Sequence, residues 1–140
     1  MSRRIALLLS FAAVLRAMPV DAAAPAAAPF PTGALTVAGV PFAVSDVLDA
    51  RALPDINGKI GIMLTLTPGA AKRLGEISAG LVGKPLPVAL DGRLLGGEVI
   101  RRPVTSGVIE IPGRWNLTDA EALARRISGR DPLPDDLGGE

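Results

Sequence analysis

The clearest pattern along the chain is a strict alternation of large apolar residues with small or polar ones over positions 59–67. One set of alternate positions carries only aliphatic side chains, namely Ile60, Ile62, Leu64 and Leu66. Successive side chains of a β-strand point to opposite faces of the sheet, so this alternation predicts a strand with one buried face.

Residues 68–81 repeat apolar side chains at the spacing of an α-helix. The stripe consists of Ala70, Leu74, Ile77 and Leu81. Thr67 precedes Pro68, and proline suits the first helical position because the backbone N–H that it lacks would be unpaired there. We therefore expect a helix that ends before Gly83 and presents its apolar stripe to a sheet.

Capping signals predict two further helices. Ser45, followed by acidic residues in the first turn, favours a short helix over residues 45–53. Thr118 and Glu121 have the spacing of a capping box, which predicts that Thr118 begins the last helix. Gly129 suits the end of that helix, because glycine readily adopts the left-handed conformation found there.

A tight hairpin turn is predicted at Asp91-Gly92, which lies between two apolar stretches. An Asp-Gly pair readily adopts the positive φ angles of a two-residue turn. Gly96-Gly97 indicates a bulge in the return strand. A further short strand is expected at residues 107–113, with a proline at its end or at a sheet edge.

This order of elements predicts an α+β fold. We expect a small mixed or antiparallel sheet of about four strands, with two main helices packed on one face. The expected organisation is a signal peptide at residues 1–24, an Ala/Pro-rich spacer at 25–43, the folded domain at 44–134 and a flexible tail at 135–140.

The first residues have the three parts of a secretory signal peptide. Arg3 and Arg4 supply positive charge, an apolar stretch follows, and a small-residue cleavage pattern ends at Ala22. Arg16 interrupts the apolar stretch before it reaches the roughly 20 residues that a spanning helix needs. We therefore expect export to the periplasm or cell envelope, with no membrane-spanning domain in the mature chain. An uncleaved signal would instead act as an N-terminal membrane anchor.

The residue types that are missing constrain the chemistry. The sequence contains no His, no Cys and no Tyr. Ser-His-Asp triads, Cys-His pairs and His- or thiolate-ligated metal sites are therefore excluded. An enzyme that used carboxylates alone would need two acids to converge in a pocket, and helix caps account for the acids better. We expect no enzymatic activity, no cofactor and no metal.

Charge and aromatic content narrow the class of partner. The formal net charge is +1, and removal of the signal would bring the chain close to neutral. Nucleic acid is therefore not an expected partner, because phosphate binding depends on a basic excess. Trp115 is the single tryptophan, either a core residue or an anchor for a partner.

Three ordered stretches resemble a known family. They are Leu-Thr-Pro-Gly-Ala-Ala-Lys at 66–72, Val-Gly-Lys-Pro-Leu at 82–86 and Leu-Asp-Gly at 90–92, and the similarity continues to Pro134. This series resembles the head of the first periplasmic domain of the SecD protein-export subunit, here as a stand-alone exported domain. The resemblance implies a soluble domain that contacts emerging preproteins. Glu98 and Trp115 stand where the family pattern leads us to expect proline and phenylalanine.

Two functional hypotheses follow. The first is a non-catalytic periplasmic protein-binding module that assists preprotein export, with exported polypeptides or Sec translocase components as partners. Its contact residues would be Asp91, Gly92, Arg93 and Trp115, together with exposed strand edges. The alternative is an orphan structural or adaptor domain of the envelope, unrelated to export, that binds one partner or self-associates. A self-associating surface would be formed by Met63, Trp115 or the strand edge at 108–111. The sequence does not give the oligomeric state.

Overall fold

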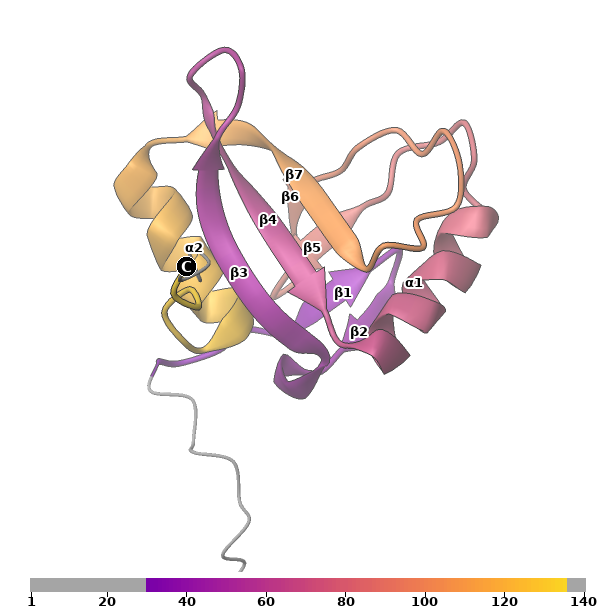
Figure 1. The fold of residues 1–140 in the computed structure, drawn as a ribbon, viewed down its shortest axis with the longest axis horizontal. Helices are drawn as coiled ribbons and strands as arrows, with labels where there is room; N and C mark the ends of the chain where they lie inside the picture. Colours follow the sequence, from indigo (N-terminus) through magenta and orange to yellow (C-terminus); the bar gives the residue numbers. More distant parts are fainter. Residues whose placement is uncertain (1–29, 136–140) are drawn as a thin grey trace, which may run out of the picture.

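The computed structural model describes residues 30–135, which form two antiparallel sheets and two α-helices (Figure 1). The three-stranded sheet has the order β3-β4-β7, with bounds Val47–Pro54, Ile60–Leu66 and Val108–Trp115. The four-stranded sheet has the order β2-β1-β5-β6, with β1 at Leu35–Val37, β2 at Val40–Phe42, β5 at Val88–Leu90 and β6 at Arg93–Gly96. The helices are α1 at Pro68–Ala79 and α2 at Leu117–Ser128, and a 3-10 turn lies at Val44–Asp46.

The predicted α+β class is confirmed, but the strands are more numerous than expected and lie in two sheets. The additional strands include β1 and β2, which fall within residues 25–43 that we had expected to be a spacer. Leu35 and Val37 are buried because β1 pairs with β5, which is about 50 positions further along the chain. β1 and β2 are three residues each, and stretches this short carry little local signal of their pairing with a distant strand.

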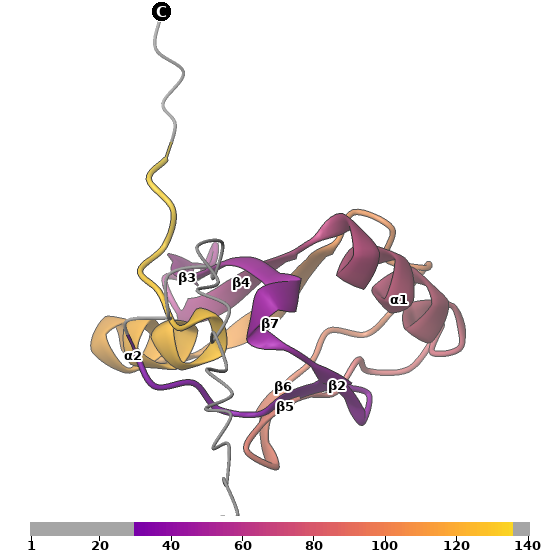
Figure 2. The same cartoon turned by 90° about the horizontal axis from the view of Figure 1, so that it is seen from below.

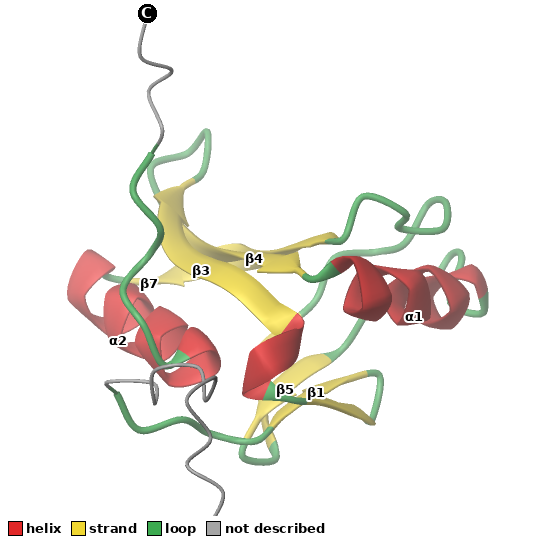
Figure 3. Ribbon diagram, turned by 60° about the horizontal axis from the view of Figure 1, so that its bottom comes forward, coloured by secondary structure: helices red, strands yellow, loops and turns green. Residues whose placement is uncertain are grey.

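The core lies between the two sheets, and α1 and α2 flank it (Figure 3). β4 was predicted correctly, and its register aligns Leu64 with Ala50 on β3 and with Ile109 on β7. All three side chains are buried, at no more than 3% exposure. One face of the central strand therefore supplies the middle of the core, as the alternation in the sequence predicted.

The prediction of a short helix at residues 45–53 is wrong. Only a 3-10 turn forms there, and its cap is Ala43 rather than Ser45. The Asp46 carboxylate accepts the backbone N–H of Ala43 at 2.8 Å. The chain then enters β3, whose pairing with β4 buries Val47 and Ala50. Antiparallel pairing and core burial override the local helix signal here.

Both main helices are present, with one change of cap. The Thr67 hydroxyl accepts the N–H of Ala70 at 3.3 Å and begins α1, as expected. The cap of α2 is Asn116 rather than Thr118, because the Asn116 side chain accepts the N–H of Asp119 at 2.8 Å. Gly129 ends α2 in the left-handed conformation, with φ at 71°.

The predicted hairpin is confirmed. Asp91 and Gly92 have φ angles of 51° and 77° between β5 and β6. The strand pairing shifts by one residue between Ala89 paired with Leu94 and Val88 paired with Gly96, which is a bulge in the return strand. The predicted last strand extends to Trp115, and its proline lies on an edge strand as expected.

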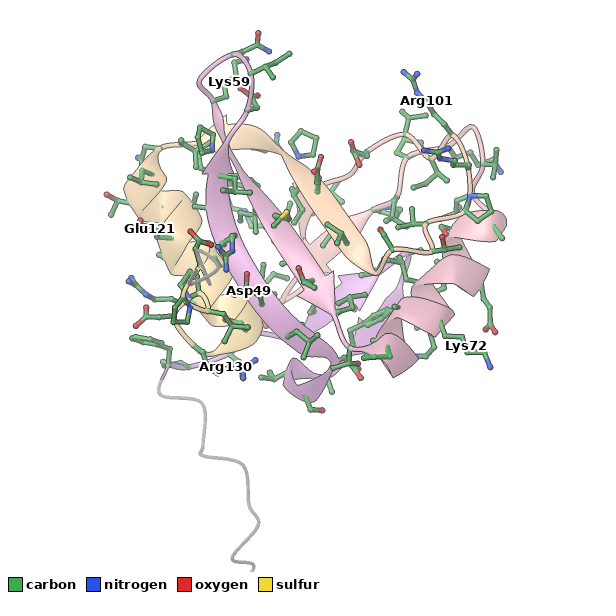
Figure 4. The ribbon with its side chains drawn as sticks, viewed as in Figure 1. Asp49, Lys59, Lys72, Arg101, Glu121 and Arg130 are labelled. Atoms are coloured by element: carbon green, nitrogen blue, oxygen red, sulfur yellow. The ribbon has the colours of Figure 1, made fainter. Side chains whose placement is uncertain are left out.

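The segment after α2 lies against β3 (Figure 4). The Asp49 carboxylate accepts the backbone N–H of Leu133 at 2.8 Å, and Arg51 donates to the carbonyl of Leu133 at 3.0 Å. Arg51 also forms an ion pair with Asp135, the first residue of the expected flexible tail. Residues 131–135 therefore form a strap on the sheet.

Three predictions fall wholly or partly outside the described residues: the signal peptide at 1–24, the start of the spacer at 25–43, and all but the first residue of the tail at 135–140. Within residues 30–135, no helix has the length and apolar character needed to cross a bilayer.

Candidate binding groove

A hollow of about 600 Å³ lies between the β5–β6 hairpin, the end of β7 and α2. Figure 2 shows the hairpin and α2 on the two sides of this region. We call this hollow the Arg–Trp groove. Its lining consists of Leu90, Arg93, Leu94, Leu95, Arg114, Trp115, Asp119, Ala122, Leu123 and Arg126. The volume falls within the range of roughly 300–1,000 Å³ that is usual for ligand sites.

Each wall of the groove comes from a different element. Arg93 and Leu94 stand on β6, directly after the hairpin turn. Arg114 and Trp115 end β7, and Ile60 on the neighbouring strand pairs with Trp115. The α2 residues lie at 119, 122, 123 and 126, which is the spacing of one helix face. The face of α2 that carries Ala120, Ala124 and Ile127 is buried in the core.

The lining is strongly basic. It contains three arginines and one acidic residue, Asp119. The Asp119 carboxylate accepts the side-chain amide of Asn116 at 3.0 Å, and Arg114 donates to the carbonyl of Leu95 at 3.1 Å. Within residues 30–135, neither Arg93 nor Arg114 takes part in an ion pair.

Asp91 holds the rim of the groove in place. Its carboxylate forms an ion pair with Arg126 on α2 and accepts the N–H of Ala34 at 2.8 Å. The backbone N–H of Asp91 donates to the carbonyl of Ala34 at 2.9 Å. The hairpin turn is therefore tied to α2 and to the segment that leads into β1.

Trp115 is half-buried, and its position fits both roles that the sequence left open, a core residue and an anchor for a partner. The indole packs against the edge of the hydrophobic core, and it also forms part of the groove wall. An indole in this position offers an apolar surface and one N–H donor to a bound molecule.

The structure brings together the residues that the sequence singled out. Arg93 and Trp115 both line the groove, and Asp91 and Gly92 form the turn at its rim. Sequence reasoning missed the contributions of Arg114 and the α2 face. The helical spacing of residues 119–126 was a usable signal, but nothing local shows that this face opposes a hairpin.

A second hollow, of about 540 Å³, lies at the outer face of the three-stranded sheet. Met63, Glu98 and Glu110 are among its lining residues. Burial, followed by the negative charge of Glu110, raises the pKa of Glu98. No group of three or more acidic, histidine or cysteine side chains in the described part of the chain is arranged to hold a metal ion.

The two edges of the three-stranded sheet differ in how they are covered. Arg130 donates to the carbonyls of Val47 and Leu48 at 2.9 and 3.1 Å, at the start of β3. On the other edge, Leu66 of β4 donates to the carbonyl of Gly107 at 2.8 Å, so alternation turns the backbone groups of Glu110 away from β4. Within residues 30–135, no strand pairs with that side of β7.

A family model described as "SecDF, P1 head subdomain" matches residues 32–129 of this chain. That range includes both sheets, both helices and every residue of the groove. The chain belongs to the SecDF P1 head family. The resemblance noted in the sequence is confirmed, and the match begins before β1.

Individual relatives agree with this assignment. The SecDF protein translocase subunit of Thermus thermophilus is 37% identical over 91 residues, which cover 64% of this chain and 12% of that protein. The SecD subunit of Rhodobacter capsulatus is 30% identical over 79 residues, 56% of this chain and 14% of that protein. This SecDF P1 head therefore spans only a small part of the length of these relatives.

Solved SecDF structures have the same fold. A crystal structure of SecDF in a super-membrane-facing form matches 69% of this chain at a TM-score of 0.58 and 35% identity, using 13% of that chain. A structure described as a membrane component SecDF that enhances protein export matches 65% of this chain at a TM-score of 0.57 and 35% identity, using 41% of that chain.

Proposed function

We propose that this SecDF P1 head is a non-catalytic protein-binding module of the periplasm or cell envelope that acts in preprotein export. Its partners are exported polypeptides or components of the Sec translocase. The proposed contact surface is the Arg–Trp groove with its rim, which includes Asp91, Gly92, Arg93 and Trp115. The proposed domain organisation remains a signal peptide followed by one folded domain.

The observation that carries this proposal is the convergence of Arg93 and Trp115 on one groove within a SecDF P1 head fold. Tryptophan and arginine are the side chains most enriched at the energetic centres of protein interfaces. Leu94, which is 60% exposed, adds apolar area beside them. An extended or irregular polypeptide can bury more of its surface in a groove between a hairpin and a helix than on a flat surface.

The test is photocrosslinking in cells from probes placed at position 93 and position 115, followed by identification of the captured proteins. Export machinery or a varied set of preproteins is the expected result. A probe at Lys72, which is exposed on α1 away from the groove, is the matched control (Figure 4). Capture of the same proteins from Lys72 as from position 93 would contradict a specific groove contact.

A second candidate function is favoured by the uncovered edge of β7. Val108 and Glu110 have backbone groups directed away from β4, and such an edge can pair with another strand. Pairing with a second copy or with one envelope protein would make the domain a structural or adaptor module unrelated to export. Capture of one unrelated envelope protein, or a concentration-dependent dimer in analytical ultracentrifugation, would support this candidate.

A further inference from the structure

We infer that the Arg–Trp groove selects acidic segments of a polypeptide, so that aspartate and glutamate side chains of the bound chain pair with its arginines. This inference rests on the proposed protein-binding function and adds a chemical preference to it. The preference has one physical origin, which is an excess of guanidinium groups in a concave site.

The charge inventory supports this preference. Arg126 is partly neutralised by Asp91, whereas Arg93 and Arg114 have no carboxylate partner within residues 30–135. Asp119 is the one acidic side chain in the lining. A guanidinium pairs with a carboxylate through two parallel hydrogen bonds, which is a stronger contact than one between neutral groups.

The shape and apolar content point to a polypeptide. Trp115 and Leu123 supply apolar area between the charged groups, and Leu94 extends that area to the rim. An extended peptide that carries acidic side chains presents carboxylates and aliphatic carbon in alternation, so it can use both. Binding to an anionic membrane typically depends on a cluster of about four to eight basic residues, and this chain is close to neutral overall.

Two of the three arginines are held by other groups of the protein, and the third is free to bind a ligand. Arg126 is tied to the hairpin turn through Asp91, which keeps the two walls of the groove at a fixed separation. Arg114 is anchored to the carbonyl of Leu95 through one nitrogen. Arg93 is exposed, so its whole guanidinium is free to engage a ligand.

The experiment uses the intact chain and three peptides of equal length that alternate serine with glutamate, glutamine or lysine. Trp115 is the only tryptophan, so its fluorescence reports directly on the groove. Anisotropy of a labelled peptide measures the same binding independently of the indole. We expect the glutamate peptide to bind at least tenfold more tightly than the glutamine peptide, with an affinity that falls as salt is raised.

Two matched charge-reversal variants test whether the preference for acidic peptides arises in the groove. Arg93→Glu is expected to weaken binding of the glutamate peptide by about tenfold, on the scale of one or two partly exposed ion pairs. Arg101→Glu changes the net charge equally at an exposed loop position outside the groove lining and is expected to leave the affinity within about twofold (Figure 4). Equal losses from the two reversals would overturn the assignment to the groove.

The remaining outcomes separate this inference from the proposed function. Equal affinity for the glutamate and glutamine peptides, with crosslinking from position 93 intact, would overturn the acidic preference and leave protein binding in place. Absence of any captured polypeptide in cells would overturn the proposed function itself. Sedimentation with anionic vesicles that Arg93→Glu abolishes, without binding of the glutamate peptide, would show that a lipid surface is the ligand and would overturn the inference.

Discussion

Asp91 in the β5–β6 turn and Arg126 on α2 form an ion pair across 35 positions of sequence. The same carboxylate accepts the N–H of Ala34 at 2.8 Å. One side chain therefore fixes the hairpin relative to α2 and to the segment that leads into β1. The rim of the Arg–Trp groove is defined by this contact.

Asp91→Asn should remove the charge pairing and keep an acceptor for Ala34, because asparagine also tolerates a turn with positive φ. Both charged side chains are half exposed, so we expect a loss of less than about 1 kcal/mol in the free energy of unfolding. Asp91→Ala should cost more, about 1 to 2 kcal/mol, since it also leaves the Ala34 N–H without its acceptor. Urea unfolding of both variants measures the difference, and equal losses would contradict this ordering.

Asp49→Ala should detach the strap formed by residues 131–135 from β3. The Asp49 side chain is only 8% exposed and accepts from Leu133 and Arg51, so its removal leaves two donors without their acceptor. We expect a loss of about 1 to 3 kcal/mol in unfolding free energy. Amide exchange at Leu133 should accelerate, and Glu121→Ala, at an exposed position of α2, should change neither quantity. Unchanged exchange at Leu133 would show that the strap is held by other contacts.

The pH dependence of stability should include a contribution from Glu98. Burial, and then repulsion from Glu110, raises the pKa of Glu98 above its ordinary value of 4.5. The folded state consequently binds the proton more tightly than the unfolded chain, so ionised Glu98 destabilises the fold as pH rises through and above that value. The effect is small because the desolvation is only partial, and the Glu98 side chain remains largely exposed to solvent.

Glu98→Gln should therefore be more stable than the unmodified chain at neutral pH. The gain should disappear as pH falls below the ordinary pKa, where Glu98 is protonated in both states. Urea midpoints over a pH series measure this gain, with the unmodified chain as the reference. A gain that persists undiminished at low pH would assign the effect to packing rather than to ionisation.

Gly97→Ala should destabilise the four-stranded sheet. A Cβ atom at position 97 would lie 1.8 Å from the carbonyl oxygen of Leu86, and a backbone atom cannot move aside as a flexible side chain would. We expect a loss of more than about 2 kcal/mol, which is the scale of a severe steric conflict. Gly69→Ala, in the first turn of α1 with open space around it, should be neutral or slightly stabilising in the same thermal melt. Similar melting temperatures for the two variants would contradict the close approach.

Asn116→Ala should cost about 1 kcal/mol, because the N–H of Asp119 loses its side-chain acceptor at the start of α2. Thr118→Ala should change stability by no more than about 0.5 kcal/mol, as for an ordinary exposed position. Chemical denaturation of the two variants compares the observed cap with the one that the sequence favoured. A larger loss of stability at position 118 than at position 116 would favour Thr118 as the cap.

Local sequence signals were sufficient to predict the elements whose conformation depends on residues adjacent in the sequence. The alternation of Ile60, Ile62, Leu64 and Leu66 specified a strand, and Thr67-Pro68 specified the start of a helix. Asp91-Gly92 specified the turn, because its backbone conformation is a property of those two residues. The α+β class and the resemblance to SecDF P1 heads followed from these signals and from ordered short stretches.

Tertiary structure decided the features that depend on distant partners. β1 and β2 exist because β5 offers an edge to Leu35 and Val37, and β3 replaces a helix because β4 pairs with it. The Arg–Trp groove has the same origin: Arg93, Arg114 and Arg126 belong to three elements, and only the docking of α2 beside the hairpin brings their charges into one hollow. Residue types set which contacts are favourable, whereas the packing of the sheets against α2 sets which of them are made.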